Sequence, residues 1–138
     1  MWWTFALLSA FFAALTAIFA KIGIKNVSTD VATAVRTVCI LIITSGIVFF
    51  TGQTRAITQL TKQNWIFLVL SGITTGLSWL FYFKALQIGK VAQVAAVDKL
   101  SVALAIVLSL IVLHESITWK MALGAALIIG GTMVLILD

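Results

Sequence analysis

The chain has 138 residues, of which 62% are hydrophobic and 9% are charged, and its net charge is +5. A soluble domain is about half apolar and about a quarter charged, so this composition excludes a soluble globular protein and predicts a lipid bilayer as its surroundings. The cations stand singly at the edges of apolar runs. This pattern favours a membrane boundary over a nucleic-acid groove, and we expect no nucleic-acid partner.

Five apolar runs are each long enough to cross the bilayer, whose roughly 30 Å of hydrocarbon requires roughly 20 helical residues. None of them shows the period-two alternation of a membrane β-barrel. We therefore expect an all-α integral membrane protein with a single domain, residues 1–138, and five transmembrane helices. The expected spans are residues 2–23, 31–51, 64–83, 91–113 and 118–137.

The connections are short, apart from a longer loop at residues 52–63, so neighbouring helices are expected to run antiparallel. Ser28, Thr29 or Asp30 can cap the second helix. Tryptophans open the first, third and fifth spans, which places them on one face of the membrane at the headgroup level. Trp79 is the exception, because it lies deep in the third span and needs a partner or a ligand to stack on.

The short loops carry almost no difference in positive charge between the two faces. The N-terminal face has three cations, Arg55, Lys62 and Lys120, and the opposite face has four, Lys21, Lys25, Lys84 and Lys90. Orientation follows the excess of lysine and arginine in short loops. This sequence therefore does not predict a single orientation in the membrane.

Two charged residues, Asp98 and Lys99, lie well inside the fourth apolar run. Each costs roughly 2.5–3.5 kcal/mol at a helix centre, so charges there are functional candidates by default. Adjacent side chains point about 100° apart on a helix, and we expect each to meet a partner on another helix. The alternative is a structural ion-pair network that sets the helix register.

Further cations are predicted in the same half of the membrane as Lys99. Arg36 lies within the second span and is expected to line a cavity, where an anionic substrate group would balance the excess positive charge. Lys21 and Lys84 are candidates for the cavity rim, although both can simply extend their ammonium groups to the lipid headgroups.

Aromatic and hydroxyl side chains complete the candidate substrate-binding set. Trp79 and Tyr82 share one helical face with Phe83, which is either ordinary packing or a ring platform for an apolar or planar part of a substrate. Ser101 shares a face with Asp98, or bonds back to its own helix. The predicted site is therefore Arg36, Trp79, Tyr82, Asp98, Lys99 and Ser101.

An enzymatic role has little support in the sequence. There is one histidine, His114, and one cysteine, Cys39, so no metal-ligand spacing is present. No phosphate-binding loop or nucleophile motif occurs either. We expect no catalytic residues, no metal and no cofactor.

Several segments in order resemble one EamA-type unit of the drug/metabolite transporter superfamily. They are Gly76–Leu86, Gly89, Val97–Ser101, Leu113–Ser116 and Leu123–Ala125, and the resemblance covers essentially the whole chain. It is closest to the small bacterial and archaeal branch with a single five-helix unit, which lacks the proline that the commoner pattern has in the fourth span. Larger members fuse two units into ten helices in inverted repeat, so the resemblance implies half of such a transporter, located in the cytoplasmic membrane as a multi-pass protein.

Together these features predict a secondary transporter. It would move a small anionic or amphipathic metabolite by alternating access, as an antiparallel homodimer around a midplane cavity. The alternatives are a membrane partner subunit that does not transport, and a flippase for lipid headgroups.

Overall fold

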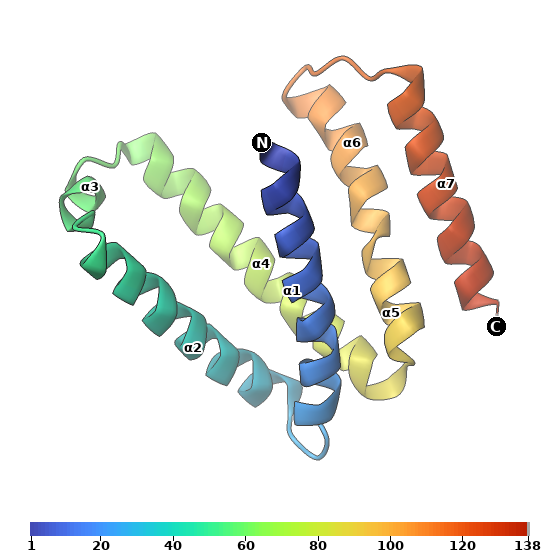
Figure 1. Cartoon of the computed structure of the whole chain (residues 1–138), viewed down its shortest axis with the longest axis horizontal. Coiled ribbons are helices and arrows are strands. Elements are labelled where there is room, and N and C mark those ends of the chain that lie inside the picture. The colour runs from blue at the N-terminus through green and yellow to red at the C-terminus, as the bar shows by residue number, and fades with distance from the viewer. Residues whose placement is uncertain (138) are drawn as a thin grey trace. The chain divides into compact units, whose positions relative to one another are not determined.

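The computed structural model describes residues 1–137, which form helices and no strand (Figure 1). The helices are α1 Trp2–Gly23, α2 Thr29–Phe50, α3 Thr54–Thr58, α4 Lys62–Ile88, α5 Val91–Asp98, α6 Leu100–Val112 and α7 Trp119–Ile136. Five stretches of the described chain are long and apolar enough to cross a membrane: α1, α2, α4, α5 with α6, and α7. The expectation of an all-α membrane protein with five transmembrane helices is confirmed. The last residue of the predicted domain, Asp138, lies outside the described residues.

The ends of α2 follow from local chemistry. Ser28 is the N-cap, with extended backbone angles, and its hydroxyl oxygen accepts a hydrogen bond from the Val31 N–H at 3.4 Å. At the other end, Gly52 adopts a positive φ of 69°, which glycine reaches without steric cost, and the chain turns away from the helix axis. Of the three capping candidates in the sequence, the structure selects Ser28.

The connection after α2 and the helix that follows it differ from the expected bounds. The loop expected at residues 52–63 contains the short helix α3. Helix α4 begins at Lys62 and continues to Ile88, beyond the expected end at Phe83. It continues because nothing between Lys84 and Gln87 disfavours a helix, and it ends just before Gly89.

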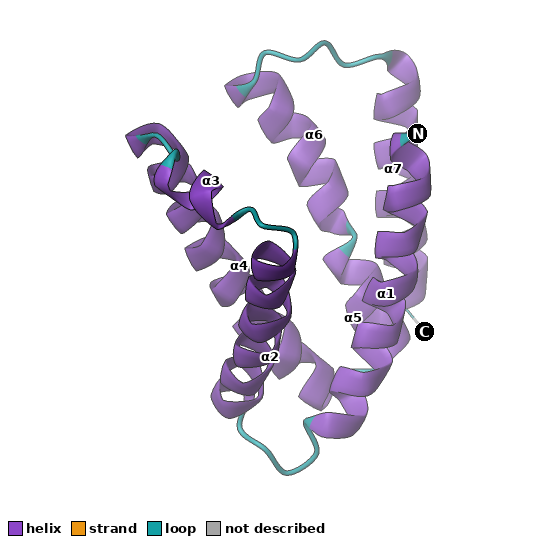
Figure 2. Cartoon of the chain, turned by 60° about the vertical axis from the view of Figure 1, so that its left-hand side comes forward, coloured by secondary structure: helices purple, strands orange, loops and turns teal. Residues whose placement is uncertain are grey.

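The fourth membrane span is divided, contrary to the continuous helix expected from its apolar run. Lys99 separates α5 from α6, and the short break is visible as a loop segment in Figure 2. The Lys99 N–H donates to the Ala96 carbonyl at 3.1 Å, and the Val102 N–H donates to the Lys99 carbonyl at 3.0 Å. Bonds between residues three apart mark a tight 3₁₀-type turn, which changes the direction of a helix without proline.

The chain divides into two compact units, each described by itself. One contains Met1–Phe19 and the chain from Ile88 onward, in which α5 and α6 both pack against α7. The other is Ala20–Gln87, with the end of α1 followed by α2, α3 and α4. In this second unit α3 joins two long helices that run in opposite directions (Figure 1).

The buried core is small. Phe83 and Leu86 on α4 are 1% and 0% exposed, and Ile24 after α1 is 4% exposed. Most large apolar side chains lie on the surface of the single chain. Such a surface is stable in lipid, which is itself apolar, so packing rather than burial from water must join these helices to their neighbours.

Candidate functional site

Arg36 of α2 and two aromatic rings of α4 form the first group of candidate residues. The guanidinium carbon of Arg36 lies 5.0 Å from the centroid of the Trp79 ring and 4.7 Å from that of Phe83. Trp79 and Phe83 are four residues apart, so they project from the same face of α4. Both distances are within the range of cation–π attraction, which is stronger where water is excluded.

The guanidinium of Arg36 has one buried donor. Its Nε is buried and has no hydrogen-bond partner among the described residues. A buried donor without an acceptor is costly, and each such group in a native structure needs an explanation. The planar guanidinium is suited to carboxylate and phosphate groups, so an anionic ligand is one chemical explanation.

Tyr82 lies beside this group. It is half-buried, its ring centroid is 6.0 Å from that of Phe83, and it interacts electrostatically with Arg36. Phe83 was placed on the aromatic face by the sequence but left out of the predicted site. The spacing of four residues between Trp79 and Phe83 could have indicated that Phe83 belongs to the site. It places both rings on one face of α4, and Arg36 lies over both.

Asp98 and Lys99 form the second group, at the break between α5 and α6. The Lys99 ammonium and an Asp98 carboxylate oxygen are 3.3 Å apart. The expectation that each would meet a partner on another helix is therefore wrong within the single chain. The long lysine side chain, which leaves the helix at the tight turn, curls back to its neighbour's carboxylate.

This ion pair is not enclosed by the chain. The Lys99 and Asp98 side chains are 58% and 40% exposed. Asp98 is the eighth residue of the 22-residue stretch Val91–Val112, about 12 Å along it at 1.5 Å per residue. Charges at such a depth normally face a protein interior or a water-filled cavity. Ser101, the remaining predicted residue on this stretch, is exposed, and its hydroxyl makes no hydrogen bond within residues 1–137.

Thr132 of α7 stabilises the break and was not predicted. Its side chain is 4% exposed, and its hydroxyl donates to the Ala96 carbonyl at 3.1 Å. The same carbonyl accepts the Lys99 N–H. An apolar helix that contains a single buried threonine facing a neighbouring span is the pattern that could have indicated this contact.

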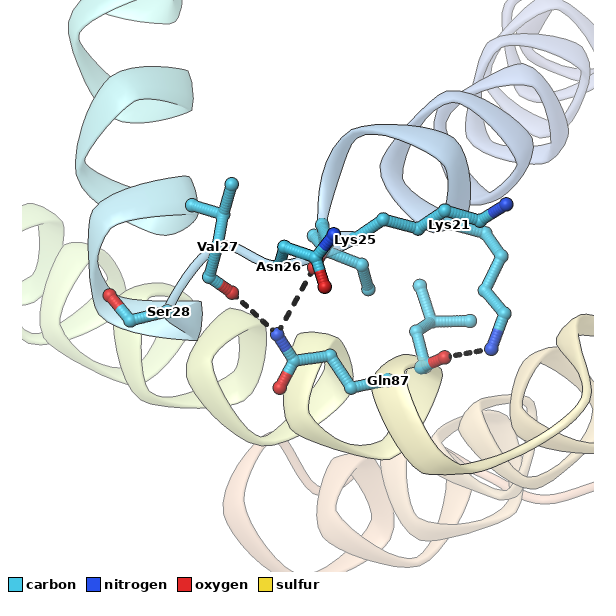
Figure 3. A pocket seen from close by; sticks show the side chains of 8 residues that line it. Lys21, Lys25, Asn26, Val27, Ser28 and Gln87 are labelled. Atoms are coloured by element: carbon cyan, nitrogen blue, oxygen red, sulfur yellow. Dashed lines mark hydrogen bonds between the residues drawn. The ribbon is translucent and has the colours of Figure 1, made fainter.

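The two rim candidates differ in their surroundings. Lys21, at the end of α1, donates from its ammonium group to the Leu86 carbonyl near the end of α4, as Figure 3 shows. Lys84 is exposed and makes no ion pair within the described part of the chain. The structure thus brings Arg36, Trp79 and Tyr82 into one group in the unit Ala20–Gln87. It brings Asp98 and Lys99 into another group, in the unit that contains the chain from Ile88 onward.

Comparison with known proteins identifies the class of this chain. The model of the EamA-like transporter family matches residues 1–137. A relative from a Sinorhizobium species, described as an uncharacterized transporter in the cobO 3′ region, is 45% identical over 134 residues, which are 97% of this chain and 95% of that protein. No solved structure gives a significant match. The chain, with its five apolar helices and its charges within them, therefore belongs to the EamA-like transporter family and is a multi-pass membrane protein of transporter type.

Proposed function

We propose that this chain is half of a secondary transporter, which two copies complete as an antiparallel homodimer. The transporter moves a small anionic or amphipathic metabolite across a bacterial or archaeal cytoplasmic membrane by alternating access. Its substrate site is a cavity near the midplane, lined by Arg36, Trp79, Tyr82, Asp98, Lys99 and Ser101, and Lys21 and Lys84 stand at the rim.

The observation that carries this proposal is the Arg36 group. A guanidinium is held over two aromatic rings, and its buried Nε donor lacks a partner among the described residues. A ligand with a carboxylate or phosphate would accept from this donor. The Trp79 and Phe83 rings would at the same time offer apolar surface to the rest of the molecule.

The exposed ion pair supports a second copy. Asp98 and Lys99 lie at membrane depth yet remain 40% and 58% exposed in one chain. A partner that covers them would remove charge from contact with lipid and enclose a cavity. The glycines on α4 are compatible with close helix approach, because a Cβ added at Gly72 or Gly76 would meet no atom within 4 Å.

A ligand screen by thermal shift in detergent tests the proposal, because a ligand that binds only the folded state raises its melting temperature. The compounds are small carboxylates and phosphates with and without an apolar part. We expect hits that stabilise the unaltered protein but not Arg36→Gln. Arg55→Gln is the matched control, because Arg55 is an exposed arginine on α3, and this variant should respond as the unaltered protein does.

Flux of the hits in proteoliposomes then separates the alternatives. Uptake of a hit that depends on Arg36 supports a transporter. A partner subunit without transport activity would bind and move nothing, and a headgroup flippase would move labelled lipid instead. Ligand responses that are the same in Arg36→Gln and Arg55→Gln would contradict the assigned site.

A further inference from the structure

A pocket of about 460 Å³ lies where the connection between α1 and α2 meets the end of α4 (Figure 3). All of its lining residues belong to the unit Ala20–Gln87. Its volume is within the range of about 300–1,000 Å³ that small-molecule sites occupy. None of the six residues of the proposed substrate cavity lines it.

Hydrogen bonds between distant parts of the chain hold the walls of this pocket. The Gln87 side-chain amide donates to the Val27 carbonyl at 2.7 Å and to the Ile24 carbonyl at 3.3 Å. The Lys21 ammonium donates to the Leu86 carbonyl. Figure 3 shows Gln87 of α4 reaching the connection and Lys21 of α1 reaching α4. These three bonds join residues that are 60, 63 and 65 positions apart in the sequence. The pocket is therefore built by tertiary contacts.

The lining carries an excess of positive charge. It includes two lysines, Lys21 and Lys25, and no carboxylate. The Lys25 ammonium and the Asn26 side-chain amide make no hydrogen bond or ion pair within the described residues, although both line the pocket. Asp30, in the first turn of α2, is not among the lining residues. The Lys25 ammonium and the Asn26 amide are thus donors suited to an oxyanion such as a phosphate group.

The place of the pocket in the fold favours a lipid as the source of that group. Helix α1 ends and α2 begins beside it, and both are membrane-spanning by length and composition. The connection therefore lies at the membrane–water boundary, where basic pockets between helices bind anionic headgroups. Val27, which lines the pocket and is 37% exposed, provides apolar surface for the glycerol and acyl carbons.

We propose that this pocket binds a phosphate-type oxyanion, through Lys25, Lys21 and Asn26, and that an anionic phospholipid headgroup supplies it. The pocket shares Lys21 with the rim of the proposed substrate cavity, but the inference does not rest on the transport function, because none of the six cavity-lining residues lines this pocket and binding can be measured without flux.

The test is thermal unfolding of the purified chain in a neutral detergent with three probes. They are short-chain phosphatidylglycerol, short-chain phosphatidylcholine and inorganic phosphate. We expect phosphatidylglycerol to raise the melting temperature and phosphatidylcholine to leave it unchanged. Stabilisation by inorganic phosphate at comparable concentration would support the oxyanion site but assign it to a soluble anion.

Variants decide whether this pocket is responsible. Lys25→Gln should weaken the binding of phosphatidylglycerol about fivefold, and Lys25→Arg should restore it, because one cation near an anionic surface contributes about that factor. Lys62→Gln removes the same charge at the start of α4, outside the pocket, and should bind as the unaltered chain does. Equal binding by Lys25→Gln and Lys62→Gln, or stabilisation by none of the probes, would overturn the proposal.

Discussion

At the scale of single residues, the most unusual contact is that of Arg36 with Trp79 and Phe83. The arginine lies within a membrane-spanning helix, where a positive charge is costly. Two ring faces at 5.0 and 4.7 Å compensate part of this cost through the negative potential above each ring. The aromatic pair therefore stabilises the charge within the span, while the buried Nε donor has no partner among the described residues.

This account predicts that Phe83 matters for stability in a way that its neighbour on α4 does not. Phe83 is 1% exposed and Phe81 is 73% exposed. We expect Phe83→Leu to destabilise the protein by about 1 kcal/mol, since a cation–π contact contributes about 0.5–2 kcal/mol. Phe81→Leu, the same change at an exposed position of α4, should have little effect. Thermal unfolding in detergent measures both.

The Phe83 effect should also depend on Arg36. In an Arg36→Gln background, Phe83→Leu is expected to cost less than in the unaltered chain, because the cation–π term is already gone. An unchanged cost in that background would mean that Phe83 contributes only packing.

Asp98 is predicted to be needed for transport. Asp98→Asn removes the charge but keeps the size of the side chain, and we expect it to abolish flux in proteoliposomes while the protein still folds. Glu115→Gln serves as the control, because Glu115 is exposed in the connection before α7. Flux of Asp98→Asn equal to that of the unaltered protein would exclude a role for this carboxylate in substrate or proton movement.

At the scale of elements, the divided fourth span is the feature that sequence patterns did not show. Its apolar run from Val91 to Val112 contains no proline or glycine, so nothing in the pattern indicated a break. At the break the Thr132 hydroxyl of α7 donates to the Ala96 carbonyl, a tertiary contact that an apolar pattern does not reveal. The helical character of each span was predictable because it depends on local apolar content, which lipid surroundings make decisive.

The candidate site was predictable to a similar extent. Charges and rings inside apolar runs indicated Arg36 and Trp79, and the structure places them in contact. The pairing of Asp98 with Lys99 was not predictable from ideal helix geometry, since it occurs at the tight turn. Thr132 was missed because a lone threonine in a membrane helix usually bonds to its own backbone, as Thr44 does with Ile40.

These two threonines provide a matched test of the break. Thr132→Val keeps the shape of the side chain but removes the donor to Ala96, and we expect a loss of about 0.6 kcal/mol, up to about 1.7, as for other hydrogen bonds between membrane helices. Thr44→Val removes a hydroxyl that bonds only within α2 and should change stability less. Thr132→Ser should keep the bond.

Transport should respond to the same variants if the break positions the ion pair. We expect Thr132→Val to lower flux and Thr132→Ser to preserve it, both measured in proteoliposomes. Full flux in Thr132→Val would show that the contact serves folding alone.

At the scale of the whole molecule, the single chain leaves a charged pair and a glycine-bearing helix face uncovered. The mid-span ion pair is exposed, and the glycines of α4 have open space beside them. Five spans place the two ends of the chain on opposite faces of the membrane. Two copies fused end to end would therefore be inverted relative to each other. Separate copies can reach the same arrangement only if the chain inserts into the membrane in both orientations. The loops favour neither orientation strongly, with three cations on one face and four on the other.

The proposed antiparallel dimer is tested most directly by measuring from which side of the membrane single cysteines can be labelled. Cys39 is replaced by alanine, and a single cysteine is then introduced at one of two positions. The first is Gln59, at the end of α3. The second is Ile88, at the end of α4, whose side chain is 89% exposed. Gln59 lies in the connection just before α4 and Ile88 is the last residue of α4, so the two positions lie on opposite faces of the membrane. A membrane-impermeant thiol reagent is then applied from one side or the other. The antiparallel dimer predicts that each position is labelled in comparable amounts from both sides. Labelling of Gln59→Cys from one side only, and of Ile88→Cys from the other only, would contradict it.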